Sequence, residues 1–212
     1  MQGPNKLLLL DKDGTLIAPK YGKWVNDDPT NQRIIPGAAE TLAAWVEAGW
    51  KPVICSNQGG VDSGYKTEEQ AIAEMSYAMS LFQPSIQCAY FCPSAPLHGW
   101  RLKMRQWLGL FKTRCIDVQH AYSDVEVWGE SSKLPFSNSS VADEYDMAGG
   151  MGIHGYRKPG GMMLFLAVEL NNLPRQDRRV LYVGDRPEDE QAAAAVGYPF
   201  RQAQDWLGSP PL

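Results

Sequence analysis

Lys6-Leu7-Leu8-Leu9-Leu10-Asp11-Lys12-Asp13-Gly14-Thr15 is the stretch of sequence that decides the fold. Residues 7–10 form a short apolar run that stops at Asp11. Continuous rather than alternating apolarity is typical of a strand that is buried on both faces, as in a parallel sheet. The stretch therefore predicts a buried strand followed directly by two aspartates, Asp11 and Asp13.

Further strands and helices alternate along the chain, except in its middle. Strands are predicted at 51–55, 86–92 and 180–183, and helices at 38–48, 67–81, 162–171 and 188–196. Thr67 is expected to cap its helix, because a threonine side chain there can accept a bond from a backbone amide of the first turn. The alternation predicts an α/β fold with a Rossmann-like, doubly wound parallel sheet that binds ligands at the carboxyl ends of its strands.

The residues from about 93 to 155 interrupt this alternation. A short helix at 101–110 and a short strand at 125–128 are predicted there, followed by a serine-rich and a glycine-rich stretch. So long a departure between core elements is usually functional or an inserted subdomain. We therefore expect a single domain over 1–212 with an inserted segment at about 93–155. The Ser209-Pro210-Pro211 end is expected to fray.

The composition is that of an ordinary globular protein. Of 212 residues, 44% are hydrophobic and 21% are charged, so the chain can bury a proper core. The formal net charge of −4 gives no overall field that would attract nucleic acid or an anionic membrane, although it leaves room for a local basic groove. No pattern in the sequence indicates an oligomeric state.

The cysteines and the apolar runs bear on the compartment. Four cysteines in a chain of this length do not suggest a disulfide framework. No run approaches the roughly 20 apolar residues needed to cross a bilayer. The sequence therefore predicts a cytoplasmic protein with reduced thiols and no membrane partner.

Polar side chains that suit metal-assisted phosphate chemistry follow the predicted strands. They are Asp11, Asp13, Ser56, Asn57, Asp185 and Asp189, with Lys158 added from a turn before a helix. Because the carboxyl ends of parallel strands meet at one edge of a sheet, these side chains can converge. Facing carboxylates would repel unless a hard cation lay between them. Mg²⁺ suits such a site, since it accepts carboxylates and keeps positions for water and phosphate oxygens.

Four short motifs in these positions resemble the motifs of the haloacid dehalogenase superfamily, in the same order and spacing. They are Asp11-Lys12-Asp13-Gly14-Thr15, Ser56-Asn57-Gln58, Arg157-Lys158-Pro159 and Gly184-Asp185-Arg186-Pro187-Glu188-Asp189. The resemblance covers residues 6–61 and 157–197, and it is of the subfamily III type. It is strongest to phosphatases of small molecules, similar to histidinol-phosphate and heptose-bisphosphate phosphatases. Polynucleotide 3′-phosphatases come second.

The resemblance implies a magnesium-dependent phosphomonoester hydrolase that acts through an aspartyl-phosphate. Asp11 is implied as the nucleophile. Asp13 is implied as the general acid and base, a role that contributes about 10²–10⁴-fold to a rate. Asp11, the Asp13 carbonyl and Asp185 are implied as ligands of Mg²⁺, with Asp189 close behind. Lys158 is implied to neutralise charge on the transferring group.

The resemblance also bears on the substrate. Ser56, Asn57 and Arg157 are implied to contact it, Ser56 and backbone amides near Asn57 through phosphoryl oxygens. The inserted segment at about 93–155 stands where the superfamily carries one class of substrate-covering cap, so it is expected to help select the substrate. Asp13 separates the subclasses, because dehalogenases lack an aspartate there and transport ATPases have threonine. Phosphoester hydrolysis is therefore favoured.

Taken singly, these residues also have ordinary structural interpretations. An Asp-x-Asp-Gly sequence suits a tight turn, and Ser56 or Asp189 could belong to a helix terminus. Asn57 could shape a loop, while Lys158 and Arg157 could be solvated surface residues. The four motifs together favour the functional interpretation.

Cys92-Pro93 stands where heptose-bisphosphate phosphatases begin a zinc loop. Ser94 replaces the first histidine of that loop, and His98 and His154 are the nearby substitutes. Four zinc ligands are hard to assemble from these residues, so zinc is not expected. Cys92 is interpreted instead as a small buried hydrophobe.

The expected partner is a small phosphorylated metabolite, such as a sugar phosphate or an amino-alcohol phosphate, and two alternatives stay open. The basic and aromatic residues at 100–107 could stack on single-stranded nucleic acid, although their spacing also suits a buried helix stripe. Residues 22–36 faintly resemble polynucleotide phosphatases, which keeps a polynucleotide 3′-phosphatase open. A non-catalytic phosphate-binding module is the other alternative, and the intact Asp11, Asp13, Lys158 and Asp185 argue against it.

Overall fold

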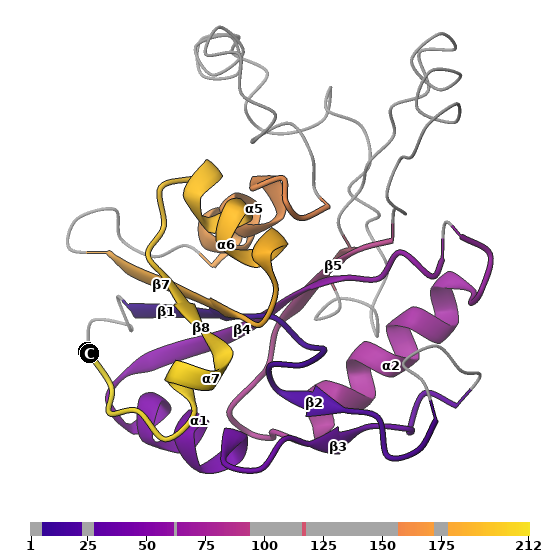
Figure 1. The fold of residues 1–212 in the computed structure, drawn as a ribbon, viewed down its shortest axis with the longest axis horizontal. Coiled ribbons are helices and arrows are strands. Elements are labelled where there is room, and N and C mark those ends of the chain that lie inside the picture. Colours follow the sequence, from indigo (N-terminus) through magenta and orange to yellow (C-terminus); the bar gives the residue numbers. More distant parts are fainter. Residues whose placement is uncertain (1–5, 23–27, 62, 94–115, 118–156, 172–177) are drawn as a thin grey trace, which may run out of the picture.

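The computed structural model describes residues 6–22, 28–61, 63–93, 116–117, 157–171 and 178–212. Within them, six strands form one central sheet in the order β6-β5-β4-β1-β7-β8 (Figure 1). The strands are β1 (Lys6–Leu10), β4 (Trp50–Asn57), β5 (Ala89–Cys92), β6 (Ile116–Asp117), β7 (Arg179–Gly184) and β8 (Phe200–Gln202). The sheet is parallel from β5 to β8, and β6 pairs with β5 in the antiparallel direction.

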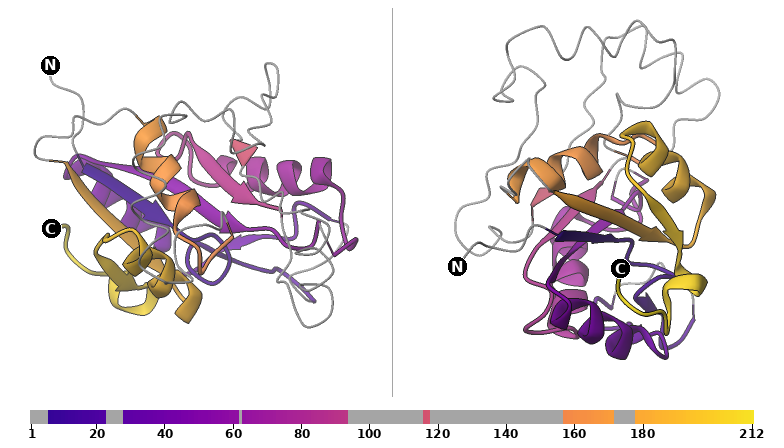
Figure 2. Two further views of the ribbon diagram at one scale, coloured as in Figure 1. Left: turned by 90° about the horizontal axis from the view of Figure 1, so that it is seen from above. Right: turned by 90° about the vertical axis from the view of Figure 1, so that its left-hand side faces the viewer.

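Helices cover both faces of the sheet (Figures 1 and 2). On one face lie α1 (Ala38–Glu47), α2 (Glu68–Ser80) and the short α7 (Ala203–Trp206). On the other lie α5 (Met162–Leu170) and α6 (Pro187–Ala195). The predicted doubly wound α/β fold is confirmed.

Strand β1 explains the apolar run that opened the sequence. Leu8 and Leu10 pack into the core beneath α1 and α2, whereas Leu7 and Leu9 pack into the core beneath α5 and α6. All four are fully buried, because β1 lies between β4 and β7 and has a layer of helices on each face. Burial on both faces removes the alternation that a half-exposed strand would show.

Several predicted boundaries need correction. Strand β4 continues through Asn57, so Ser56 and Asn57 are its last two residues and do not follow it. The predicted strand at 86–92 begins only at Ala89. The predicted cap of α2 is confirmed, since the Thr67 side chain accepts a bond from the Gln70 amide and Gln70 bonds back to the Thr67 amide.

Several parts of the fold were not predicted, among them β6, β8 and α7. Strands β2 (Ile17–Ala18) and β3 (Arg33–Ile34) form a small antiparallel pair beside the main sheet. The chain end is held and does not fray at Ser209, whose carbonyl oxygen accepts a bond of 3.3 Å from the Trp45 indole. The expectation of a frayed end is therefore wrong at Ser209, where the buried Trp206 of α7 brings the chain against α1.

The predicted insertion is described only in part. Its residues Ile116 and Asp117 form β6 at the edge of the sheet. The helix predicted at 101–110, the strand predicted at 125–128 and the histidines His98 and His154 lie outside the described residues. Among the helices that are described, none has the length and apolar character needed to cross a membrane.

Candidate active site

Three aspartates meet at the carboxyl edge of the sheet. Asp11 follows β1, and its amide donates to the Val183 carbonyl of β7 at 2.9 Å. Asp185 follows β7, and Asp189 lies in the first turn of α6. One carboxylate oxygen from each of the three lies within 4.8 Å of the others. Asp11 and Asp189 are buried, whereas Asp185 is exposed, so the cluster has an inner and an outer side.

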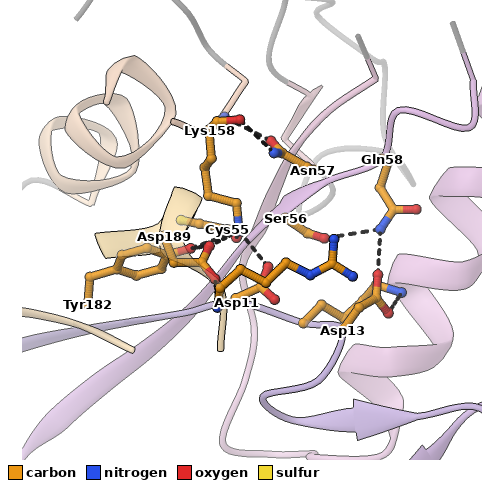
Figure 3. A network of polar contacts seen from close by, with 11 residues as sticks. Asp11, Asp13, Cys55, Ser56, Asn57, Gln58, Lys158, Tyr182 and Asp189 are labelled. Carbon is orange, nitrogen blue, oxygen red and sulfur yellow. Dashed lines mark hydrogen bonds and ion pairs between the residues drawn. The ribbon is translucent and has the colours of Figure 1, made fainter. Parts of the chain in front are cut away.

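The ammonium group of Lys158 lies among the inner carboxylates (Figure 3). Its Nζ is 2.5 Å from Asp11 Oδ1 and 2.6 Å from Asp189 Oδ1. It also donates to the Tyr182 hydroxyl at 2.8 Å and to the Cys55 carbonyl at 3.3 Å. Lys158 is only 4% exposed, so this is a buried cation and not the solvated lysine of the structural interpretation.

Burial and crowded charge dominate the electrostatics of the cluster. Burial raises the pKa of Asp11 to about 7, the charges of Asp189 and Asp13 add to the rise, and Lys158 opposes it. Burial opposes the charge on Lys158, but the Asp11 and Asp189 carboxylates outweigh burial and raise its pKa. One ammonium, that of Lys158, thus shares the cluster with three carboxylates, those of Asp11, Asp185 and Asp189.

The donor set of the cluster fits a hard divalent cation. All the candidate ligands are carboxylate oxygens, the type that Mg²⁺ and Ca²⁺ prefer. A cation among them would favour the ionised carboxylates and offset their mutual repulsion. Asp11, Asp185 and Asp189 could therefore hold such an ion.

Asp13 lies beside this cluster and makes its own contacts. Gln58 Nε2 donates to Asp13 Oδ2 at 3.3 Å and to Ser56 Oγ at 3.0 Å (Figure 3). The ammonium of Lys12 is 2.7 Å from the other Asp13 oxygen, an ion pair without hydrogen-bond alignment. Because Ser56 Oγ accepts from Gln58, its hydroxyl hydrogen can point toward a ligand oxygen.

Asn57 contacts Lys158 through both ends of its amide. Its Nδ2 donates to the Lys158 carbonyl at 3.0 Å, and its Oδ1 accepts from the Lys158 amide at 3.0 Å. This pair of bonds joins the end of β4 to the turn before α5. The side chain therefore orients the Lys158 backbone. Arg157, next to Lys158, is half-buried, and its carbonyl accepts from the Gly160 amide at 2.8 Å.

The sequence model of the polynucleotide kinase 3 phosphatase family matches residues 6–195, which include every residue of this site. The chain belongs to this family. The match extends over most of the chain and takes in all four of the motifs named above. The predicted resemblance to haloacid dehalogenase phosphatases is confirmed.

Individual relatives carry names of sugar-phosphate phosphatases. The chain is 33% identical over 94 residues to the D-glycero-D-manno-heptose-1,7-bisphosphate 7-phosphatase of Chlorobaculum tepidum, across 43% of this chain and 46% of that one. It is 30% identical over 92 residues to the D-glycero-beta-D-manno-heptose-1,7-bisphosphate 7-phosphatase of Haemophilus influenzae, across 42% of this chain and 48% of that one. The matched segment thus spans about half the length of each of these two relatives.

A solved structure has the same fold. The D,D-heptose 1,7-bisphosphate phosphatase from B. bronchiseptica, complexed with magnesium and phosphate, superposes with a TM-score of 0.54. The likeness covers 92% of this chain and 78% of that one at 18% identity. At this identity the likeness establishes the fold alone.

Sequence reasoning missed two side chains that complete this family member's site. Tyr182 lies within apolar β7, and its hydroxyl donates to Asp189 Oδ1 at 2.8 Å while it accepts from Lys158. Burial, followed by the charge of Asp189, raises the pKa of Tyr182, so the hydroxyl stays protonated. The available signal was the hydroxyl of Tyr182 among the apolar residues of the strand predicted at 180–183. From the sequence, Gln58 stands out only as the last residue of the Ser56-Asn57-Gln58 motif.

The cysteine considered for zinc, Cys92, and the nearby Cys88 lie in the core. Cys92 is fully buried in β5, and Cys88 is 2% exposed just before that strand. Their burial agrees with the interpretation of small core residues. The histidines that would have to join them are His98 and His154, which fall in the part of the chain that the structure does not describe.

Gly14 allows the close approach of Asp185 and yields a prediction. Its φ of +90° is unfavourable for other residues, and a Cβ there would overlap the Asp185 carboxylate. We expect Gly14→Ala to push Asp185 away and weaken divalent-cation affinity by about tenfold or more. The measurement is a Mg²⁺ titration followed by the rise in melting temperature.

Gly197→Ala is the matched control for Gly14→Ala. Its φ is +69°, but a Cβ there meets nothing within 4 Å. It should therefore carry the same kind of backbone strain, about 1–3 kcal/mol, without a change in Mg²⁺ affinity. Equal Mg²⁺ affinities in the two variants would contradict the role given to Gly14.

Proposed function

We propose that this protein is a magnesium-dependent phosphomonoester hydrolase that acts on a small phosphorylated metabolite, a sugar phosphate in the first place, through an aspartyl-phosphate on Asp11. The observation that carries the proposal is the buried ion pair between Asp11 and Lys158 beside the Asp185 and Asp189 carboxylates. It combines a nucleophile, a cation for the transferring group and a candidate metal cluster at one edge of the sheet. The names of the sugar-phosphate relatives support the substrate class.

The proposed reaction has two displacements at phosphorus. An Asp11 oxygen attacks phosphorus, the bond to the leaving oxygen breaks, and Asp13 gives its proton to that oxygen. Water then attacks the aspartyl-phosphate, Asp13 takes its proton, and the phosphorus–Asp11 bond breaks to release phosphate and restore Asp11. Two easier steps replace one hard displacement.

The remaining residues bind charge during these steps. Lys158 Nζ lies 2.5 Å from Asp11 Oδ1. As Asp11 bonds to phosphorus, this ammonium would neutralise the negative charge on the phosphoryl oxygens. Ser56 would donate its hydroxyl to such an oxygen, together with backbone amides near Asn57. Arg157 would orient the rest of the substrate.

The proposed cofactor is Mg²⁺. Asp11, Asp185 and the Asp13 carbonyl would hold it, with Asp189 behind them, and when bound it would neutralise developing charge on the phosphoryl group. The segment at about 93–155 is proposed to select the substrate, and cytoplasmic location remains part of the proposal.

The test is a panel of phosphorylated metabolites, assayed for phosphate release. We expect turnover with Mg²⁺ and its loss with EDTA, restored by added Mg²⁺, because the cluster would lose the cation that offsets its charge. Turnover that EDTA leaves unchanged would contradict the metal dependence. Tight phosphate binding without turnover of any substrate would instead support a phosphate-binding module.

A second candidate activity is removal of 3′-phosphates from polynucleotides, and the family match at residues 6–195 favours it. A 3′-phosphorylated oligonucleotide and sugar phosphates should be compared by kcat/KM at two salt concentrations. A higher kcat/KM on the oligonucleotide that falls steeply with salt would support the second candidate, because phosphate contacts of nucleic acids release counterions. A higher value on sugar phosphates would support the first.

The role of Asp13 can be tested through the leaving group. Asp13→Asn should lower kcat/KM for an alkyl phosphate by about 10²–10⁴-fold, because its leaving oxygen needs a proton. The loss should be much smaller for the first step with p-nitrophenyl phosphate, whose leaving group departs as a stable anion. An equal loss on both substrates would contradict the general-acid role.

A further inference from the structure

A buried ion pair lies outside the residues that the proposed reaction uses. Lys66 Nζ is 2.7 Å from Oε1 and 2.6 Å from Oε2 of Glu74, in helix α2. The two side chains are only 6% and 9% exposed. Burial of such a pair costs desolvation free energy that the ionic attraction often does not recover. Stabilisation of the fold is therefore a weak explanation for the pair. The contact that Lys66 makes with Gln58 points to another role for the pair.

The chain folds back sharply after β4, which brings Lys66 next to Gln58. After Gln58, the Tyr65 and Lys66 amides both donate to the Gly60 carbonyl, at 2.9 and 3.3 Å. Gly60 leaves room for the lysine stem, since a Cβ there would be 3.0 Å from Lys66 Cε. The loop thereby returns the Lys66 ammonium to the side chain of Gln58, the residue that follows β4.

Gln58 joins this ion pair to Asp13. Its Oε1 accepts from Lys66 Nζ at 3.4 Å, and its Nε2 donates to Asp13 Oδ2 at 3.3 Å. A lysine can only donate and a carboxylate can only accept, so both neighbours require the same orientation of the amide. Gln58 is 4% exposed, which leaves it little freedom to turn away. Figure 3 shows its amide above Asp13 and beside Ser56.

We propose that Gln58, oriented by the buried Lys66–Glu74 ion pair, is a positioning residue that holds the Asp13 carboxyl for proton transfer. The inference rests on the proposed role of Asp13 as general acid and base. Asp13 is held from two sides, by Gln58 at Oδ2 and by Lys12 at Oδ1. Loss of one side frees the carboxyl to rotate, and misplacement of a reacting group lowers the rate of the step that it serves.

The test is the Gln58→Met variant, which keeps the length of the side chain and removes its amide. We expect kcat/KM for an alkyl phosphate to fall by about tenfold or more. For p-nitrophenyl phosphate kcat/KM should fall much less, because departure of this group does not depend on a proton from Asp13 and the variant affects it only through the lost bond to Ser56. Gln87→Met, at an exposed amide that donates to the nearby Pro84 carbonyl, is the control and should change neither value.

A double-mutant cycle with Asp13→Asn separates positioning from general damage. If Gln58 acts through Asp13, then once Asp13 is Asn the Gln58→Met change should lower kcat/KM for the alkyl phosphate no more than it lowers kcat/KM for p-nitrophenyl phosphate. Equal losses on both substrates, or an undiminished loss on the alkyl phosphate in the Asp13→Asn background, would overturn the proposal. Failure of the proposed function would look different, since the unchanged protein would then turn over no phosphate or Asp13→Asn would remain fully active.

The double variant Lys66→Met/Glu74→Met tests the ion pair without leaving one charge buried alone. Replacement of both charges by apolar residues is often neutral for stability. We expect a folded protein whose kcat/KM for the alkyl phosphate is lowered in the same selective way as in Gln58→Met. A folded double variant with unchanged activity on both substrates would remove the ion pair from the proposal.

Discussion

Asp11→Asn is expected to lower kcat by more than about 10⁴-fold, because an amide oxygen is a poor nucleophile for the first displacement. The substitution changes one atom in the side chain and leaves a partner for the Lys158 ammonium, whose other carboxylate contact is Asp189 at 2.6 Å. It also removes a buried charge, because burial first and then repulsion by Asp189 and Asp13 raise the pKa of Asp11. The variant should therefore fold, and kcat on the best substrate of the panel is the measurement.

The control for Asp11→Asn is Asp205→Asn, an exposed aspartate in α7. It makes the same chemical change outside the cluster and should leave kcat unaltered. Melting temperatures of both variants show whether a loss of activity reflects unfolding. A folded Asp11→Asn protein with activity near that of the unchanged chain would remove Asp11 from the role of nucleophile.

Lys158→Met is expected to have the second-largest effect, and to act on both activity and stability. Without the ammonium, Asp11 and Asp189 face each other in a buried site, and removal of one partner of a buried pair costs about 3–5 kcal/mol. The rate should also fall, by about 10³-fold, because the charge on the transferring group loses its preorganised cation. The measurements are the free energy of unfolding without metal and kcat with Mg²⁺.

The matched control is Lys51→Met, at the start of β4 and therefore at the other end of that strand from Ser56 and Asn57. Lys51 is half-buried and lies outside the charged cluster. Its loss should change the free energy of unfolding by about 1 kcal/mol or less, as charges in contact with solvent usually do, and leave kcat unchanged. Mg²⁺ should partly recover the stability of Lys158→Met, since the cation replaces some of the lost positive charge. A Lys158→Met protein as stable and as active as the control would contradict the account of the cluster.

The convergence of the site could be predicted because it depends on local patterns. A continuous apolar run such as Leu7–Leu10 indicates a strand buried on both faces, and parallel strands put their carboxyl ends at one edge. The positions of Asp11 and Asp185 follow from these two facts, and Asp189 follows in the first turn of α6. The structure brings Lys158 to the same edge from the turn before α5, through the amide of Asn57.

The contacts between distant segments could not be predicted in this way. Tyr182 looks like a strand residue among apolar neighbours, and only the packed structure brings its hydroxyl to Lys158 and Asp189. The bond from Gln58 to Asp13 joins residues 45 positions apart. The Ser209 carbonyl accepts its hydrogen bond from Trp45, which lies 164 positions earlier. Periodicity reports which face a residue occupies and carries no information about such partners.

The most direct test of the central claim is to trap the phosphorylated side chain of Asp11. Asp13→Asn should be used with p-nitrophenyl phosphate and Mg²⁺, because its good leaving group allows the first displacement while the missing base slows the second. Borohydride reduction of an aspartyl-phosphate yields homoserine, which mass spectrometry of the peptide can locate. The account predicts homoserine at position 11, dependent on substrate. Homoserine at position 185 or 189, or a variant that turns over substrate with none at position 11, would contradict it.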